Sequence, residues 1–320
     1  MQWSEQFHPS PLDEQSALPQ LALVNLDQYK AITLVGEDAS SYLQGQITCD
    51  VTSLDREQST LGAHCDAKGK VWSVFRLFHH QAGLAMVQDA DGLATELTEI
   101  KKYAVFSKVT IEESQHIVMG LMGQNVQDFI DAQTETRADV RSVLGGTAVK
   151  IDSQRWMLLV EPEHLEHYLN AVETKFTASI WDRFDIEAGL PRLPKSQQNQ
   201  HIPQALNLHL LGAISFTKGC YTGQEIVARA KYRGINKRAL YPVKTTGTLQ
   251  ASSSLTLERQ VGENWRGAGE LLIHYRFETQ GAIGLVVLPN NLEQDTRLRL
   301  AEQPELEWSI MDLPYSLTEE

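Results

Sequence analysis

The stretch Phe216–Arg238, FTKGCYTGQEIVARAKYRGINKR, contains the strongest local patterns of this 320-residue sequence. Thr222 and Glu225 have the Thr-x-x-Glu spacing of a capping box, in which both side chains bond to backbone N–H groups at the start of a helix. An apolar-containing run follows, so the spacing predicts a helix that begins at Thr222. Cys220 then lies two residues before this helix, and Lys218 lies two residues before the cysteine.

Cys220 is the candidate reactive residue of this stretch. A helix N-terminus and a neighbouring ammonium group both favour the thiolate form of a cysteine. The alternative is a buried and inert cysteine, because cysteine is among the residue types most often found inside proteins. Cys49 and Cys65 lack such neighbours, and we expect both to be small core residues.

The same stretch is basic in an acidic protein. Residues 218–238 carry six basic side chains and a single acidic one, Glu225, whereas the whole chain has a net charge of −13. With Tyr221 and Tyr232 between the charges, the segment suits RNA or the carboxylates of an anionic ligand. An ordinary solvated helix face would have the same composition. The basic residues are Lys218, Arg229, Lys231, Arg233, Lys237 and Arg238.

Composition limits the class of protein. Hydrophobic residues make up 42% of the chain and charged residues 22%, which is typical of a soluble folded protein. The net negative charge excludes binding of nucleic-acid backbones over the whole surface. The three cysteines suggest neither a disulfide framework nor a metal box, so we expect no metal site and a reducing, cytoplasmic location. The longest apolar run, Ala282–Leu288, is too short to cross a membrane.

The order of the expected elements divides the chain into two regions. Short strands and helices alternate through about residue 190, and they include a hairpin of Thr60–Cys65 and Lys70–Phe78. Five short strand candidates then follow with almost no helical periodicity, which is typical of a small barrel or sandwich. We therefore expect domains at 1–238 and 239–320. The five candidates are Tyr241–Thr245, Ser254–Arg259, Gly267–Phe277, Ala282–Leu288 and Thr296–Leu300.

Four further segments have patterns that predict local structure. Tyr103–Ile111 and Ile180–Glu187 alternate in the manner of strands. His164–Phe176 has apolar residues on one helical face and predicts a helix. Lys195–His201, KSQQNQH, is polar and glutamine-rich, and it predicts an exposed loop.

The octapeptide KGCYTGQE at Lys218–Glu225 resembles the K-G-C-[FY]-x-G-Q-E signature of the YgfZ family, which comprises folate-binding, tRNA-modifying proteins. The resemblance covers nearly the whole chain. It implies an α+β fold similar to the aminomethyltransferase of the glycine cleavage system. In that fold, a folate-binding region of intertwined subdomains surrounds a central hole, and a C-terminal β-barrel follows. The other matching segments are 65–70, 101–111, 186–189, 202–205 and 313–317.

The resemblance also implies a site for tetrahydrofolate or one of its one-carbon derivatives. Trp181 matches a tryptophan of the family directly, and Tyr29 stands where relatives have tryptophan. Flat aromatic faces suit a pterin or aminobenzoyl ring. Glu187 matches a glutamate that accepts the adjacent N–H donors of a pterin edge. Without the resemblance, core packing would explain both aromatic residues and a surface position would explain Glu187.

The acidic residues that assist one-carbon chemistry in aminomethyltransferases are absent here. The matching place is Trp72-Ser73-Val74, which offers no carboxylate to steer a proton. The resemblance therefore favours a folate-dependent accessory protein over a transferase. It implies a role in tRNA modification and in the maturation or repair of iron–sulfur enzymes, including those that thiolate tRNA. Cys220 would supply one ligand to a shared cluster, since a whole cluster normally takes four, or attack an electrophilic one-carbon group.

Three functions remain open. The first is a cytoplasmic folate-binding accessory protein that serves tRNA modification and iron–sulfur enzymes. The second is a one-carbon transferase that uses Cys220, with Lys218 beside it, or Glu187 in place of the lost acid. The third is an RNA-binding module whose basic 229–238 segment contacts tRNA. The folate hypotheses carry one geometric expectation, that the thiol of Cys220 borders a cavity shared by Trp181 and Glu187.

Overall fold

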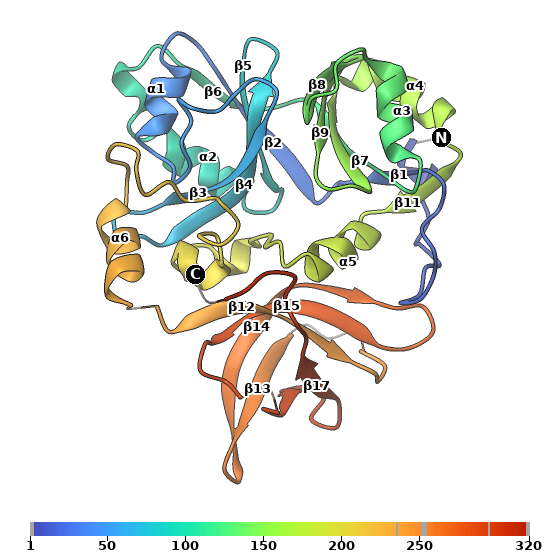
Figure 1. Ribbon diagram of the computed structural model, residues 1–320, viewed down its shortest axis with the longest axis vertical. Helices are drawn as coiled ribbons and strands as arrows, with labels where there is room; N and C mark the ends of the chain where they lie inside the picture. Colours follow the sequence, from blue (N-terminus) through green and yellow to red (C-terminus); the bar gives the residue numbers. More distant parts are fainter. Residues whose placement is uncertain (1–2, 235, 251–254, 294, 318–320) are drawn as a thin grey trace.

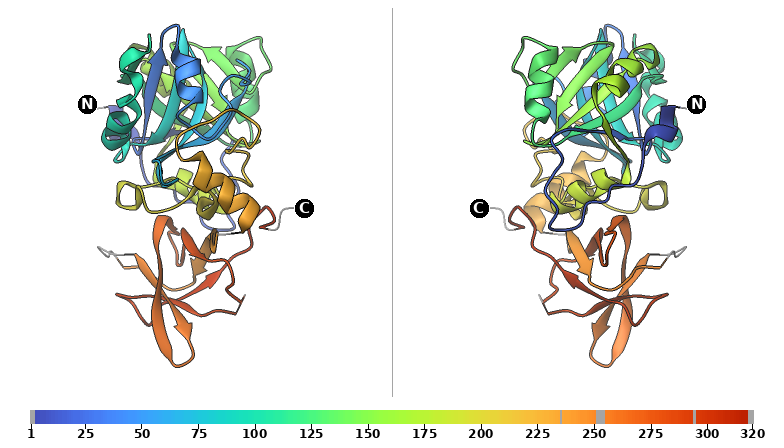
Figure 2. Two further views of the ribbon diagram at one scale, coloured as in Figure 1. Left: turned by 90° about the vertical axis from the view of Figure 1, so that its left-hand side faces the viewer. Right: turned by 90° about the vertical axis from the view of Figure 1, so that its right-hand side faces the viewer.

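Two β-sheets stand side by side above a β-barrel in the computed structural model of the chain (Figure 1). The structure describes residues 3–234, 236–250, 255–293 and 295–317. The side views in Figure 2 show the barrel as a separate layer beneath the sheets, with helices between the two layers.

The first sheet has five strands and is formed by the chain between residues 29 and 113. Its elements are β2 (Tyr29–Val35), α1 (Ala39–Gln44), β3 (Ser59–Cys65), β4 (Val71–His80), β5 (Gly83–Asp89), α2 (Leu93–Lys101), the 3-10 helix η2 (Ala104–Phe106) and β6 (Thr110–Glu113). The strand order is β3-β4-β5-β2-β6, and all neighbours are antiparallel. Helices α1 and α2 cover one face, where Tyr42 and Ile100 belong to the same apolar core as Phe75.

The second sheet has six strands, which come from both sides of that region in the sequence. The elements are η1 (Trp3–Gln6), β1 (Ala22–Asn25), β7 (Ile117–Met122), α3 (Val126–Gln133), β8 (Val140–Val143), β9 (Gly146–Lys150), β10 (Arg155–Val160), η3 (Pro162–His164), α4 (Leu165–Ala171) and β11 (Thr174–Thr177). The order is β11-β1-β7-β10-β9-β8. Because β1 precedes the first sheet and β7 follows it, the two subdomains are intertwined as expected.

A helix lies where the two sheets meet the barrel. The connecting elements are α5 (Ser179–Glu187), η4 (Lys195–Gln197), η5 (Pro203–Leu206) and α6 (Gln224–Arg233). Figure 1 shows α5 between both sheets and the barrel. Its residues Trp181 and Ile186 share one continuous apolar core with Val74 and Met157 of the facing sheets and with Ile273 of the barrel. Burial of this core holds the three parts together.

The barrel is closed in the order β12-β15-β14-β13-β16-β17. Its strands are β12 (Arg238–Thr245), β13 (Thr256–Val261), β14 (Asn264–Arg276), β15 (Ala282–Pro289), β16 (Leu298–Leu300) and β17 (Glu307–Ile310). The chain then returns to the first region, where the Tyr315 hydroxyl donates a hydrogen bond to the Gly189 carbonyl at 2.8 Å.

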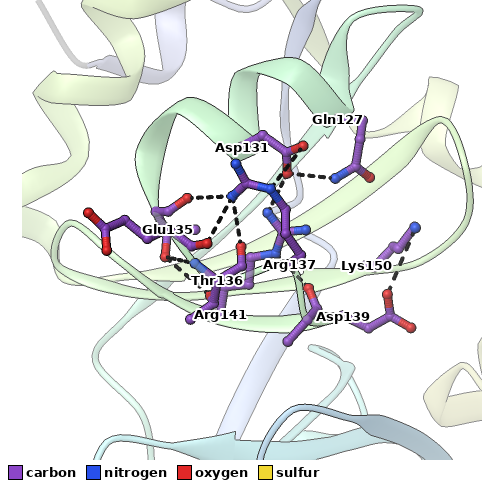
Figure 3. Close-up of polar contacts among 10 residues, drawn as sticks. Gln127, Asp131, Glu135, Thr136, Arg137, Asp139, Arg141 and Lys150 are labelled. Carbon is purple, nitrogen blue, oxygen red and sulfur yellow. Dashed lines mark hydrogen bonds and ion pairs between the residues drawn. The ribbon is translucent and has the colours of Figure 1, made fainter.

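A buried arginine fixes the connection between α3 and β8 (Figure 3). The guanidinium of Arg141 lies 4.7 Å from the ring centroid of Trp156 and donates to Asp131 Oδ1 at 2.6 Å. Arg141 lowers the pKa of Asp131, mainly through this hydrogen bond. Gln127 donates to the same carboxylate at 2.9 Å. The buried Arg141 is thus paired with Asp131, and the contacts are those of a structural network.

Most predicted strands are confirmed. The hairpin of Thr60–Cys65 and Lys70–Phe78 corresponds to β3 and β4, and Cys49 and Cys65 are buried as expected. The five barrel candidates overlap β12 to β16, although Ser254 lies outside the described residues. Strand β17 was not expected from the sequence. The α+β fold with its terminal barrel is therefore confirmed.

Four local predictions are wrong in whole or in part. Residues 103–111 form a turn and η2 before β6 begins, and the predicted helix at 164–176 ends with α4, so that Thr174–Thr177 can pair with β1 as β11. Residues 180–187 form α5 and not a strand. The helix is buried on several sides, so it has no single apolar stripe. Gln197, predicted in an exposed loop, is only 6% exposed.

His80 connects the facing sides of the two sheets and gives a prediction about pH. Its Nδ1 shares a 2.8 Å hydrogen bond with the Thr147 hydroxyl of β9, and its ring packs edge-on against His116. Burial, with a smaller effect of His116, lowers the pKa of His80 from 6.5 to about 4. Between these values the unfolded chain binds a proton that the folded chain does not. The free energy of unfolding should therefore fall as pH decreases through this window, by up to about 3 kcal/mol.

Urea unfolding followed by circular dichroism between pH 7 and 4 tests this expectation. His80→Gln should flatten the pH dependence relative to wild type, whereas His8→Gln, which changes an exposed histidine, should leave it unchanged. Parallel curves for wild type and His80→Gln would contradict the assignment.

Candidate functional site

A small cavity lies where the two sheets and α5 converge. Its free volume is about 50 Å³. The wall combines strands of both sheets with one face of α5 and the loop that follows it. The lining residues are Tyr29, Leu61, Val74, Phe75, Arg76, Val87, Ile151, Met157, Trp181, Asp185, Leu190, Pro191 and Arg192. Segments from four parts of the sequence therefore meet at one place.

The two aromatic residues singled out by the family resemblance both line this cavity. Tyr29 is the first residue of β2, and Trp181 lies on α5, where its side chain is almost fully buried. Trp181 packs so closely against β7 that a Cβ at Gly120 would lie 2.5 Å from its ring. The structure thus brings Tyr29 and Trp181 together, and their role toward a ligand stays a prediction.

The acidic group on the cavity wall is Asp185, which sequence reasoning missed. Its Oδ2 accepts a 2.8 Å hydrogen bond from the Tyr29 hydroxyl, and its Oδ1 accepts a 2.7 Å bond from Arg155 Nη1. The side chain of Arg155 is 1% exposed and stacks over the Trp181 ring at 4.8 Å. Arg155 Nη2 is buried without a hydrogen-bond partner among the described residues. A buried, charge-paired carboxylate therefore faces the cavity.

Glu187 does not line this cavity. Its carboxylate accepts a 2.9 Å hydrogen bond from Arg183 Nε one turn earlier on α5. In a strand, Trp181, Asp185 and Glu187 would share one face, because side chains repeat every two residues. In the helix, Asp185 follows Trp181 by one turn and stays beside it, whereas Glu187 is rotated away. The helical spacing of Trp181 and Asp185 is the pattern that could have identified Asp185.

Arg192, in the loop after α5, also lines the cavity. Its guanidinium donates to Asp89 Oδ2 at 2.7 Å and to Asp182 Oδ1 at 2.9 Å, and it lies over the Tyr29 ring at 5.6 Å. Burial raises the pKa of Asp182 to about 6, although Arg192 acts in the opposite direction. Ion pairs therefore hold this part of the cavity wall in place.

The segment before α6 differs from the prediction. The helix begins at Gln224, and its N-cap is Gly223 with φ +83° and no side-chain cap. A Cβ at Gly223 would lie 2.5 Å from the Asp66 carbonyl oxygen, so only glycine fits between the helix and the β3–β4 turn. Glu225 instead forms an ion pair with Arg229 at 2.6 Å. The capping box predicted at Thr222 is therefore wrong.

Cys220 is exposed, and its thiol does not border the aromatic cavity. Gly223, three residues after Cys220, packs against Asp66 in the turn of the β3–β4 hairpin. The strands of the same hairpin contribute Leu61 to the cavity wall. The lining residue nearest the turn is Val74, which pairs with Ala63, two strand positions or roughly 7 Å from Cys65, and Cys220 is not among the residues that line the cavity. The expectation that Cys220, Trp181 and Glu187 share one hollow is therefore wrong.

Lys218 faces the backbone and not the thiol. Its Nζ donates to the carbonyl oxygens of Ile47 and Cys49, both at 2.7 Å, and lies 5.0 Å from the Tyr221 ring centroid. Burial lowers the pKa of Lys218 to about 8. Lys218 thus fixes the loop that presents Cys220.

The outer face of α6 combines exposed aromatic and basic side chains. Tyr232 is 70% exposed and packs edge-on against Phe216 at 6.3 Å. Lys231 Nζ lies 4.0 Å from the Phe216 ring centroid. Of the predicted basic 229–238 segment, Arg229, Lys231, Arg233 and Lys237 are exposed, and Arg238 begins the first strand of the barrel.

Comparisons with known proteins agree with this architecture. Residues 236–303 match the family model "YgfZ, beta-barrel domain". Relatives named "tRNA-modifying protein YgfZ" include those of Vibrio atlanticus (52% identical, 100% of both chains), Photobacterium profundum (48%, 97% of this chain and 96% of the relative) and Yersinia enterocolitica (40%, 98% of both).

The fold is also that of a solved aminomethyltransferase. The glycine cleavage system aminomethyltransferase T of Bartonella henselae superposes with a TM-score of 0.73 over 94% of this chain and 88% of that chain, at 13% identity. Within the described residues, no helix is both long and apolar enough to cross a membrane. With full-length identity near 50% to its relatives, the chain belongs to the YgfZ family and has an aminomethyltransferase-like fold that ends in a β-barrel.

Proposed function

We propose that the chain is a cytoplasmic folate-binding accessory protein that acts in tRNA modification and in the upkeep of iron–sulfur enzymes. The name of its relatives, "tRNA-modifying protein YgfZ", supports the first role. The observation that carries the folate proposal is the convergence of Trp181, Tyr29 and Asp185 on one cavity between the sheets.

The cavity has the chemistry that a reduced pterin needs. Trp181 and Tyr29 offer aromatic faces for a flat ring. The Asp185 carboxylate is suited to accept two adjacent N–H donors of a pterin edge. The Tyr29 hydroxyl bonds to Oδ2 and Arg155 to Oδ1, so the ligand would replace the hydrogen bond from Tyr29 and share Oδ1 with Arg155. Bound tetrahydrofolate would supply a carrier for one-carbon groups.

Entry of this ligand requires side chains to move. A free volume of about 50 Å³ holds only a few water molecules, whereas ligand pockets usually measure several hundred Å³. Arg192 and Tyr29 are polar residues of the lining, and each is held by polar contacts that a polar ligand is able to exchange. Binding should therefore be accompanied by displacement of Arg192.

An accessory role is favoured over a transferase. The carboxylate on the cavity wall, Asp185, is already paired with Arg155 and so is a poor proton carrier. Trp72-Ser73-Val74 brings no further acid to the wall. A transferase that uses Cys220 would need the thiol near the ligand, and Cys220 is not among the residues that line the cavity. For iron–sulfur enzymes, the exposed Cys220 is suited to give a single ligand to a cluster shared with a client.

Titration with tetrahydrofolate under anaerobic conditions, followed by calorimetry, tests the folate proposal. Wild type should bind saturably, and Trp181→Ala should bind at least about tenfold more weakly, because the ring loses its stacking partner. Trp265→Ala, which changes a barrel tryptophan outside the cavity, should bind as wild type does.

Trp181 is buried, so the alanine variant needs a test of folding. Thermal unfolding will establish whether it is native, and Trp181→Phe, which keeps a ring in place, should recover most of the affinity. Absence of saturable binding by wild type would remove the folate proposal, whatever the variants do.

A further inference from the structure

A second and larger cavity lies at the junction between the sheet region and the barrel. Its free volume is about 440 Å³, which is within the range of small-molecule sites. One wall is the segment that contains Gln197, Gln200 and His201, and the other is the barrel rim with Arg238 and Glu270. The family resemblance assigns nothing to this junction cleft.

A chain of hydrogen bonds holds the two walls of the junction cleft in place. Gln197 is buried, and its Nε2 donates to Glu270 Oε2 at 2.6 Å. Its Oε1 lies 3.0 Å from His201 Nε2, so the imidazole must donate and carries its proton on Nε2. Burial, together with Arg238 and Lys70, lowers the pKa of His201 to about 4. His201 is therefore neutral near pH 7, and the cleft keeps its shape there.

The residues that line the junction cleft include one cation, Arg238, and one carboxylate, Glu270. Arg238 Nη2 donates to the carbonyl oxygens of Ala268 and Val287 at 2.6 and 2.8 Å, which fixes the guanidinium on the barrel rim. Its Nε is buried and has no hydrogen-bond partner among the described residues. Burial and, to a smaller extent, the nearby Arg259 lower the pKa of Arg238.

Two neighbouring groups define where an anion would fit. Lys70 Nζ donates to the Gln200 carbonyl at 2.7 Å and so lies beside the same cleft. The Glu270 carboxylate opposes an anion, and Gln197 holds it on the inner wall. The attractive end of the cleft is thus the end formed by Arg238, Lys70 and the exposed Gln200.

We propose that the junction cleft binds a phosphate group, with Arg238 as its central cation. The phosphate is either part of an RNA backbone or that of a free nucleotide. Helix α6, with its exposed Tyr232 and its basic residues, ends at Arg233, and β12 begins five positions later with Arg238. Exposed aromatic side chains beside a line of cations are the features that hold single-stranded RNA. The inference extends the proposed role in tRNA modification and does not depend on folate binding.

Binding measurements with three probes separate the possible sources of the phosphate. Fluorescence anisotropy with a labelled single-stranded RNA, and calorimetry with AMP and with inorganic phosphate, should be done at low and moderate salt. Arg238→Gln should weaken RNA binding about tenfold and reduce the salt slope by about one unit. Arg297→Gln, which changes an arginine of the barrel outside the cleft, should have no effect on either quantity.

Arg238 also donates hydrogen bonds to two barrel carbonyls, so Arg238→Gln could weaken binding by destabilising the barrel. A second variant tests the cleft without removing these bonds. Gln200→Glu places a negative charge at the exposed mouth of the cleft with almost no change in volume. It should weaken phosphate binding as strongly as Arg238→Gln and leave thermal unfolding unchanged. Loss of AMP and phosphate binding along with RNA would indicate a nucleotide pocket, and loss of RNA binding alone would indicate a backbone contact.

Wild-type affinities in both Arg238→Gln and Gln200→Glu would overturn the inference, as would absence of binding of all three probes to wild type. Tetrahydrofolate titration of the same variants should give wild-type values. If folate binding fails in every protein while the phosphate results hold, the folate proposal alone is removed.

Discussion

Asp185→Leu is expected to lower the free energy of unfolding by about 3 kcal/mol, because it removes one partner of a buried ion pair. The Arg155 side chain is 1% exposed and would keep only Asp152, which is 40% exposed. The Tyr29 hydroxyl would also lose its acceptor. The remaining cation is then poorly compensated in a region that excludes water. Urea unfolding at pH 7 measures the change.

Two further substitutions separate charge from shape at this position. Asp185→Asn keeps the volume and one acceptor oxygen, so about half of the loss is expected. Asp139→Leu removes an exposed acid whose ion pair with Lys150 spans 3.8 Å, and it should change stability by less than about 0.5 kcal/mol. A loss below about 1 kcal/mol for Asp185→Leu would contradict a central role for the buried pair.

The barrel shows what the sequence alone predicts well. Strands such as Ala282–Leu288 are short, apolar and bounded by turn residues, and each was found at nearly its observed position. Strand β17 (Glu307–Ile310) was missed because it has only four residues in an acidic surrounding, and its pairing with β12 and β16 makes it a strand. The local sequence pattern thus predicts strands that have a clear run of apolar residues. It misses a short strand such as β17, which is recognised only by its pairing with β12 and β16.

Helix α5 shows why the candidate site was only partly predicted. The resemblance identified Tyr29 and Trp181, and both line the cavity. It did not identify Asp185, because the segment was predicted as a strand and the matching acid was Glu187. Arg155 and Arg192 were missed for another reason: their partners come from distant segments, so only the folded chain brings the charges together.

The largest functional effect is expected from Cys220→Ser. In a bacterial strain that lacks the gene for this chain, wild-type protein should restore thiolated tRNA nucleosides, measured by mass spectrometry, and Cys220→Ser should restore less than about a tenth of that amount. The reason is that a hydroxyl is a far weaker metal ligand and nucleophile than a thiolate. The prediction rests on the proposed function.

The free energy of unfolding and the affinity for tetrahydrofolate should be the same in Cys220→Ser as in wild type. This result would show that the thiol and the cavity have separate roles. The side chain is exposed, and a Cβ at the preceding Gly219 would meet nothing within 4 Å, so the loop tolerates change. Thr217→Ser, an equally small change at an exposed neighbour, should restore wild-type levels of thiolation. Full restoration by Cys220→Ser would refute a role for the thiol. A parallel loss of folate affinity would contradict the separation of the thiol from the cavity, whose lining does not include Cys220.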